Sequence, residues 1–242
     1  MEGEQSRRRF LQATVALGAV GLAGGGPGRM SKPEKQKKGP AGKTGKADEE
    51  VSLAEDLMRE HGVLKRVLLV YGESLRRLGA REELPPEALA DSARIIRSFI
   101  EDYHEKLEED FLFPRFRKAN TLVDLVEVLL AQHRAGRRLT DTTLRLSTLK
   151  TIRDPNERKL LADSLKSFIR MYSPHEARED TVLFPAFRKI VSGNEYDALG
   201  EQFEDKEHEL FGADGFEKMV DRVAGIEKKL GIYDLAQFTP KP

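Results

Sequence analysis

Apolar positions recur at helical spacing from about residue 52 to residue 230, and no stretch alternates regularly enough to predict a strand. The first predicted helix begins at the capping box Ser52–Glu55 and ends near Leu78, just before Gly79. Its inner face is marked by leucines at helical spacing: Leu57, Leu64, Leu68 and Leu75. This pattern is typical of an amphipathic helix that packs on one side against a core.

Five further helices are expected after the first. In chain order they are a helix from Pro85-Pro86 to about Lys118, one from Asn120-Thr121 to about Leu149, one from Asp154-Pro155 that is interrupted at Ser173-Pro174 and ends before Gly193, and two shorter helices over 195–211 and 215–230. Short connections make consecutive long helices antiparallel. The predicted fold class is therefore all-α, an up-down-up-down four-helix bundle with two additional C-terminal helices.

The chain before residue 51 differs in composition from the rest. A basic head precedes a mild apolar run, and the stretch Ser6–Gln12 (SRRRFLQ) resembles a twin-arginine export signal with Gln12 in place of the usual lysine. The resemblance implies export to the periplasm, with membrane contact only through this segment if it is not cleaved. A disordered basic tail is the alternative.

The predicted domain organisation has four parts. They are a twin-arginine-type signal over 1–23, a linker rich in Gly, Pro and Lys over 24–50, the four-helix bundle over 51–192 and a C-terminal helical extension over 193–242 that packs on the bundle.

Charge and cysteine content narrow the function classes. Lysine plus arginine and aspartate plus glutamate both number 41, so nothing indicates nucleic acid as a partner. The chain has no cysteine, which excludes disulfides, thiolate metal sites and a cysteine nucleophile. Any metal must therefore be held by histidines and carboxylates.

A fifteen-residue frame occurs twice in the sequence. Residues 104–118 read HEKLEEDFLFPRFRK and residues 175–189 read HEAREDTVLFPAFRK, 71 positions later. His61 and His133 also lie 72 positions apart. We interpret this as an internal duplication in which the third and fourth helices repeat the hairpin of the first two, about a pseudo-twofold axis.

The spacing of four histidines predicts that they share one layer of the bundle. The midpoints of His61 and His104, of His104 and His133, and of His133 and His175 all fall in or beside predicted connections. In antiparallel helices, residues equidistant from a turn lie at the same height, and an error of two residues displaces a level by only about 3 Å.

Two glutamates join this layer. Glu108 and Glu179 each follow a histidine by four positions, so histidine and glutamate share an inward helix face. Buried carboxylates require a partner or a metal. Four nitrogen donors and two carboxylates without sulfur suit iron or manganese, with zinc possible. Each glutamate has two oxygens with which it can bridge two metals, and two histidines for each metal complete the protein donors.

The order His…His-x3-Glu…His…His-x3-Glu resembles the hemerythrin-like, or HHE cation-binding, family over roughly residues 52–190. The resemblance implies a four-helix bundle and a non-haem centre of two oxo- or hydroxo-bridged iron ions, with manganese or zinc less favoured. Its implied ligands are His61, His104, Glu108, His133, His175 and Glu179, with the two glutamates bridging. The ferritin-like di-iron family is the rival, but only Glu101-x-x-His104 fits its repeated Glu-x-x-His motif.

Two departures from the family pattern bear on function. The position where oxygen carriers place a further histidine is Arg137 here, and Asp180 competes with Glu179 for the last carboxylate. The missing histidine favours reaction with dioxygen, peroxide or nitric oxide over simple oxygen carriage. Whether the protein is an enzyme, a sensor, a non-catalytic iron or zinc store, or a structural adaptor stays open, as do its redox partner and oligomeric state.

Five further residues near the predicted centre are expected to have supporting roles. His208 is expected to have an outer or structural role, and Tyr103 and Tyr172 are expected either to donate a hydrogen bond near the centre or only to pack. Pro114 and Pro185, six positions after each glutamate, are expected to bend their helices and remove an amide donor.

Overall fold

The computed structural model describes residues 51–240. The predicted export signal and linker lie outside these described residues. Residues Val51–Pro242 form one compact unit. Within the described range the chain is helical and contains no strand, which confirms the all-α fold class, and no helix there is long and apolar enough to span a membrane.

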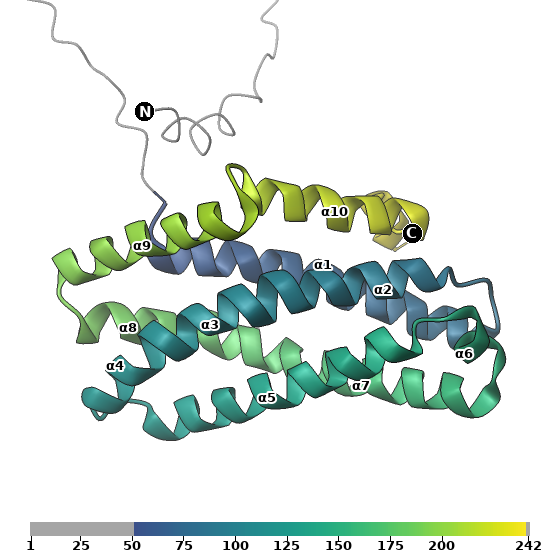
Figure 1. Cartoon of the computed structure of the whole chain (residues 1–242), viewed down its shortest axis with the longest axis horizontal. Helices are drawn as coiled ribbons and strands as arrows, with labels where there is room; N and C mark the ends of the chain where they lie inside the picture. Colours follow the sequence, from purple (N-terminus) through teal and green to yellow (C-terminus); the bar gives the residue numbers. More distant parts are fainter. Residues whose placement is uncertain (1–50, 241–242) are drawn as a thin grey trace, which may run out of the picture. The chain divides into compact units, whose positions relative to one another are not determined.

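Four long helical segments form the bundle (Figure 1). The first is α1 (Leu53–Ala80), which begins as predicted where the Ser52 hydroxyl accepts a hydrogen bond from the Glu55 N–H at 3.4 Å. The second runs through α2 (Pro86–Ile95), a π-helical segment (Ile96–His104), α3 (Glu105–Leu107), a second π-helical segment (Glu108–Leu112) and α4 (Phe113–Lys118). The third is α5 (Val123–Leu146), and the fourth comprises α7 (Pro155–Arg178), a π-helical segment (Glu179–Leu183) and α8 (Phe184–Ile190).

Shorter elements complete the unit. Helix α6 (Leu149–Arg153) lies in the connection between α5 and α7, which shortens the third helix relative to the expectation. The C-terminal region forms α9 (Gly193–Phe211), α10 (Gly215–Lys229) and a 3-10 turn (Leu235–Phe238). Helices α9 and α10 pack on α1, and α10 also packs on α2 (Figure 1).

The core of the bundle is apolar above and below the histidine layer. Its largest fully buried side chains are aromatic rings and leucines, including Phe99, Phe116, Phe168, Phe187, Leu64 and Leu89. Each such side chain contributes about 1.5–3 kcal/mol when it is removed from water. These contacts fix the four backbones against one another and so fix the positions of the polar residues between them.

The helix that carries Pro174 is not interrupted there, contrary to the sequence-based expectation. α7 continues through Pro174 to Arg178, and the hydrogen-bond ladder changes only after it, where the Phe184 N–H donates to the Glu179 carbonyl five residues back. The second long helix repeats this change, because the Phe113 N–H donates to the Glu108 carbonyl.

The prolines of the repeat explain the two wider turns. Pro114 and Pro185 have no N–H for the carbonyl four residues back, and their rings crowd that carbonyl. Each is the second residue of the α-helix that follows a π-helical segment, and the wider turn of that segment relieves the crowding. The bends expected at these prolines are therefore register changes that begin at the two predicted metal-ligating glutamates.

Gly136 in α5 faces a packed aromatic ring, so we expect Gly136→Ala to destabilise the protein. A Cβ atom there would lie 2.0 Å from the Tyr172 hydroxyl oxygen, and the Tyr172 ring is buried. Overpacking of this kind costs about 1–3 kcal/mol. Gly72→Ala is the matched control, because a Cβ there meets nothing within 4 Å and should stabilise the exposed helix by about 0.5–1 kcal/mol. Urea unfolding of both variants checks the opposite signs.

Candidate metal centre

Each of the four long helical segments supplies one buried histidine to the same layer. The side chains are His61 from α1, His104 from the end of a π-helical segment, His133 from α5 and His175 from α7, and none is more than 4% exposed. The rings form two pairs, with centroids 4.6 Å apart for His61 and His104 and 5.1 Å apart for His133 and His175. The structure thus brings together the four histidines that the turn midpoints placed at one height.

Glu108 and Glu179 lie between the two histidine pairs. The Glu179 oxygens lie 3.4 Å from His61 Nε2 and 3.1 Å from His175 Nε2. The Glu108 oxygens lie 3.9 Å from His104 Nε2 and 3.4 Å from His133 Nε2. Each carboxylate therefore directs one oxygen towards each histidine pair, which is the arrangement that a carboxylate shared by two cations needs.

Outer hydrogen bonds set the orientation of all four imidazoles. Each Nδ1 atom faces an oxygen acceptor; the pairs are His61 with Asp180 at 2.7 Å, His104 with Glu60 at 2.6 Å, His133 with Glu109 at 3.1 Å and His175 with Gln132 at 2.8 Å. The Nδ1 atoms donate to these acceptors, so the Nε2 lone pairs point inward. Metal-ligating histidines are typically held in this way.

Six of the eight inward atoms lack hydrogen-bond partners. Within the described chain, His104 Nε2, His133 Nε2 and both oxygens of Glu108 and Glu179 are buried without one. Leaving a buried polar group unsatisfied costs about 1–3 kcal/mol, and more for a charged one. Six inward atoms without a hydrogen-bond partner fit bound cations, which would satisfy them together.

Among the groups of donor atoms in the described residues that are close enough to hold a cation, two contain Glu179. His61, His104 and Glu179 form one, and His133, His175 and Glu179 form the other, with all ligand atoms of a group within 4.8 Å of one another. Glu179 belongs to both groups. The residues present thus suit two neighbouring cations that share a carboxylate.

Burial and neighbouring charge shift the pKa values of the two carboxylates in opposite directions. Burial beside Glu179 raises the pKa of Glu108 well above its usual range. Burial also acts to raise the pKa of Glu179, but the combined effect of His175 and His61 lowers it below its usual range. Burial acts to lower the pKa of His61, yet Asp180 and Glu179 raise it to about 9. Without a cation, one carboxylate is thus stabilised by protonation and the other by imidazolium.

The sequence analysis did not assign the outer acceptors Glu60, Glu109 and Gln132. A signal was available, because Glu60 and Gln132 each directly precede a histidine and lie 72 positions apart, and Glu109 and Asp180 lie 71 apart. Asp180, considered as a rival to Glu179, faces His61 Nδ1 instead.

Arg137, at the position where the resemblance would place a further histidine, forms ion pairs. Its guanidinium lies 2.9 Å from Glu105 and 2.8 Å from Glu109. Glu101, the residue that fits the ferritin-like motif, accepts a hydrogen bond from Thr140 at 2.6 Å and pairs with Arg97 at 3.0 Å. These contacts direct the Arg137 guanidinium and the Glu101 carboxylate away from the inward donor atoms.

The two tyrosines have hydrogen-bond partners beside the centre. The Tyr172 hydroxyl donates to Glu105 at 2.6 Å, and its ring stands edge-on to His175. The Tyr103 hydroxyl lies 3.5 Å from the Phe203 carbonyl, on α9. His208 is half-buried on α9, and no cation-sized group of donors in the described chain includes it.

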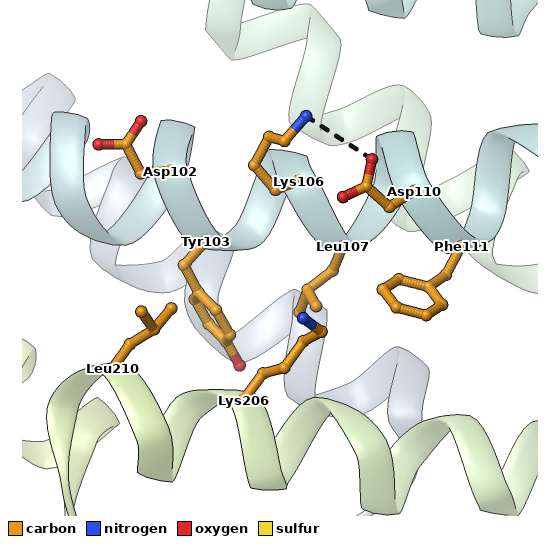
Figure 2. A pocket seen from close by; sticks show the side chains of 8 residues that line it. All are labelled: Asp102, Tyr103, Lys106, Leu107, Asp110, Phe111, Lys206 and Leu210. Atoms are coloured by element: carbon orange, nitrogen blue, oxygen red, sulfur yellow. Dashed lines mark ion pairs between the residues drawn. The ribbon is translucent and has the colours of Figure 1, made fainter.

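A small cavity of about 50 Å³ lies between the second helix and α9 (Figure 2). Tyr103 and Leu107 reach into it from one side and Lys206 and Leu210 from the other, and the Lys106 ammonium pairs with Asp110 at its edge (Figure 2). None of the six predicted metal ligands lines it. This cavity is therefore not the space between the predicted ligands.

Glu176 gives a pH-dependent test of the metal-free core. Burial raises its pKa to about 7, from 4.5. Above pH 4.5 the unfolded chain releases this proton while the folded chain retains it. This group therefore lowers the stability of the folded chain progressively as the pH rises from 4.5 to 7, and it has no such effect below pH 4.5. We expect Glu176→Gln to leave the stability of the metal-free protein unchanged at pH 4 and to raise it by roughly 1–3 kcal/mol at pH 8. Urea unfolding at both pH values checks this; an equal effect at both would contradict the assigned burial of its charge.

Comparisons with known proteins agree with the all-α fold class. The family described as hemerythrin HHE cation binding domain matches residues 52–157 and 124–238. Uncharacterized protein Rv1995 of Mycobacterium tuberculosis and Uncharacterized protein Mb2018 of Mycobacterium bovis are each 48% identical over 97% of this chain and 91% of their own length. No solved structure matches the chain at a significant level. The chain belongs to the hemerythrin HHE cation-binding family.

Proposed function

We propose that the protein is an exported, non-haem di-iron protein that binds or reacts with dioxygen, peroxide or nitric oxide. The observation that carries the proposal is the placement of Glu108 and Glu179, each with one oxygen towards each histidine pair. His61 and His104 would hold one iron, His133 and His175 would hold the other, and the two glutamates would bridge them.

The donor set suits iron, and the resemblance to hemerythrins favours iron over the other cations that it suits. Four imidazoles and two carboxylates, without sulfur, suit iron or manganese, with zinc possible. Two histidines and one oxygen from each glutamate give four protein donors for each cation, fewer than the six of an octahedral site. A bound iron pair supplies redox chemistry, and the remaining positions suit an oxo or hydroxo bridge and a small molecule.

The walls of the centre favour a small apolar ligand or peroxide as the partner. The Phe184 ring stacks on His61 and the Phe113 ring stacks on His133, each at 5.5 Å between centroids. These rings come from the Leu-Phe-Pro repeats that follow the bridging glutamates. They cover one face of each of these two imidazoles with apolar surface, which suits a small ligand.

A non-catalytic iron or zinc store is the second candidate. It is favoured by the burial of the six predicted ligands, none of which is more than 4% exposed. Turnover of peroxide separates the two candidates, because a store needs no reaction.

Export rests on the sequence of residues 1–23, which lie outside the described residues. We propose further that this segment directs the folded protein out of the cytoplasm by the twin-arginine route, and that membrane contact is through this segment if it is not cleaved. Nucleic acid is not among the proposed partners.

Metal content is the first test. The full chain, purified after expression in iron-replete medium, should contain about two irons per chain and show near-ultraviolet charge-transfer bands. His104→Ala and Glu108→Ala should each lower the iron content, because each removes an inward donor. His208→Ala is the matched control and should keep both irons. Zinc in excess of iron would overturn the di-iron proposal and favour the zinc store.

Peroxide turnover is the second test. The iron-loaded protein should release oxygen from hydrogen peroxide, and His175→Ala should abolish this release while His208→Ala preserves it. An oxygen electrode measures the rates, and iron content is determined in parallel. Two bound irons with no turnover and no shift of the optical spectrum on adding peroxide, dioxygen or nitric oxide would favour storage.

A further inference from the structure

The four outer acceptors occupy corresponding positions in the two repeats, but in one of the two pairs their chemical type differs. Glu109 and Asp180 correspond in the two repeats, and each faces the Nδ1 atom of a histidine in the other hairpin. Both of these acceptors are carboxylates. Glu60 and Gln132 also correspond, and each faces the Nδ1 atom of the second histidine in its own hairpin. Here the repeat places a carboxylate against His104 and a neutral amide against His175.

This single difference changes the donor strength of one histidine. A hydrogen bond from an imidazole N–H to a carboxylate is charge-assisted and roughly twice as strong as one to a neutral acceptor. It also raises the basicity of the opposite nitrogen, the one that binds the metal. His61 and His104 both have carboxylate acceptors, whereas in the other pair His133 has a carboxylate and His175 an amide.

The surrounding charges act in the same direction. Beside His133, the Arg137 guanidinium lies 2.8 Å from the acceptor Glu109 and withdraws part of its charge. The corresponding cation beside His61 is Lys65, which is 3.4 Å from Asp180 and half exposed to water. Glu60 is buried in a group with Asp56 and Glu207, whose donor atoms lie within 4.8 Å of one another. Further carboxylates thus adjoin Glu60, on the side of the His61 and His104 pair.

Packing by the C-terminal region encloses this acidic side. Asp56 lies 3.6 Å from Arg59, and Glu207, on α9, accepts the Phe216 N–H at 3.0 Å. Gln132 is only partly buried. The strong acceptor therefore lies in the more enclosed of the two environments, where charge is screened least.

We propose that Glu60 and Gln132 are positioning residues that make the two metal positions inequivalent. The position held by His61 and His104 binds its cation more tightly than the position held by His133 and His175. It also stabilises the higher oxidation state of its cation more strongly. This inference rests on the proposed two-cation centre and adds an order of filling and of oxidation to it.

Anaerobic calorimetric titration of the metal-free full chain with ferrous iron tests the order of filling. The protein should bind two irons in two resolved steps whose Kd values differ about 10–100-fold. Glu60→Gln should weaken the tighter step until the two merge, and Gln132→Glu should strengthen the weaker step until they merge at the tighter value. Glu101→Gln is the matched control, a buried glutamate that faces none of the four histidines, and should leave both steps unchanged.

The identity of the tighter position is tested in a background that keeps one histidine pair. In His133→Ala the remaining tight step belongs to His61 and His104, so it should weaken on adding Glu60→Gln and should not respond to Gln132→Glu. A redox titration supplies the readout that loss of folding cannot mimic. Glu60→Gln should raise the midpoint potential of the first iron to be oxidised. The rise should be about 59 mV for each tenfold decrease in the affinity for ferric iron relative to that for ferrous iron.

The outcomes separate the inference from the proposed function. Two irons bound with equal affinity in the native protein, or two steps whose separation is unchanged in both Glu60→Gln and Gln132→Glu, would overturn the inference alone. Absence of any iron binding by a chain with native helical content would overturn the proposed function together with the inference. Because the two substitutions act in opposite directions, a folding defect in one leaves the other to decide.

Discussion

The burial of two carboxylates between four imidazoles is the constraint on which the rest of the structure depends. Moving Glu108 and Glu179 out of water is costly unless they gain partners. The other polar contacts are arranged around this cost. Four outer acceptors accept hydrogen bonds from the Nδ1 atoms, so that the Nε2 atoms face the carboxylate oxygens. A core arranged in this way is satisfied by cations and not by further protein groups.

The sequence predicted well that these six side chains lie in one buried layer, because antiparallel helices with short connections turn sequence distance into height. His61 and His104 lie at one level although they are far apart in the chain, and only the location of the turn is needed to see this. It did not predict the change of register at Glu108 and Glu179. A proline such as Pro185 indicates a missing hydrogen bond, but whether the helix breaks, kinks or widens depends on packing against its neighbours.

The outer acceptors were harder to predict for a related reason. Glu60 adjoins His61 in the chain but faces His104, and Glu109 adjoins Glu108 but faces His133. Such pairs join different helices, and they depend on the rotation of each helix about its axis to within a fraction of a turn. Hydrophobic periodicity gives that rotation only coarsely, and the π-helical segments shift it further.

Duplication alone would make the two halves of the centre equivalent, and the C-terminal region adds to the difference that Glu60 and Gln132 introduce between them. Helices α9 and α10 pack on α1, and α10 also on α2, so they enclose the hairpin that carries Glu60. Tyr103 reaches the Phe203 carbonyl of α9, whereas the corresponding residue of the repeat is Pro174, inside α7. An added pair of helices can thus change the dielectric surroundings of one histidine pair without altering any residue that faces the cations.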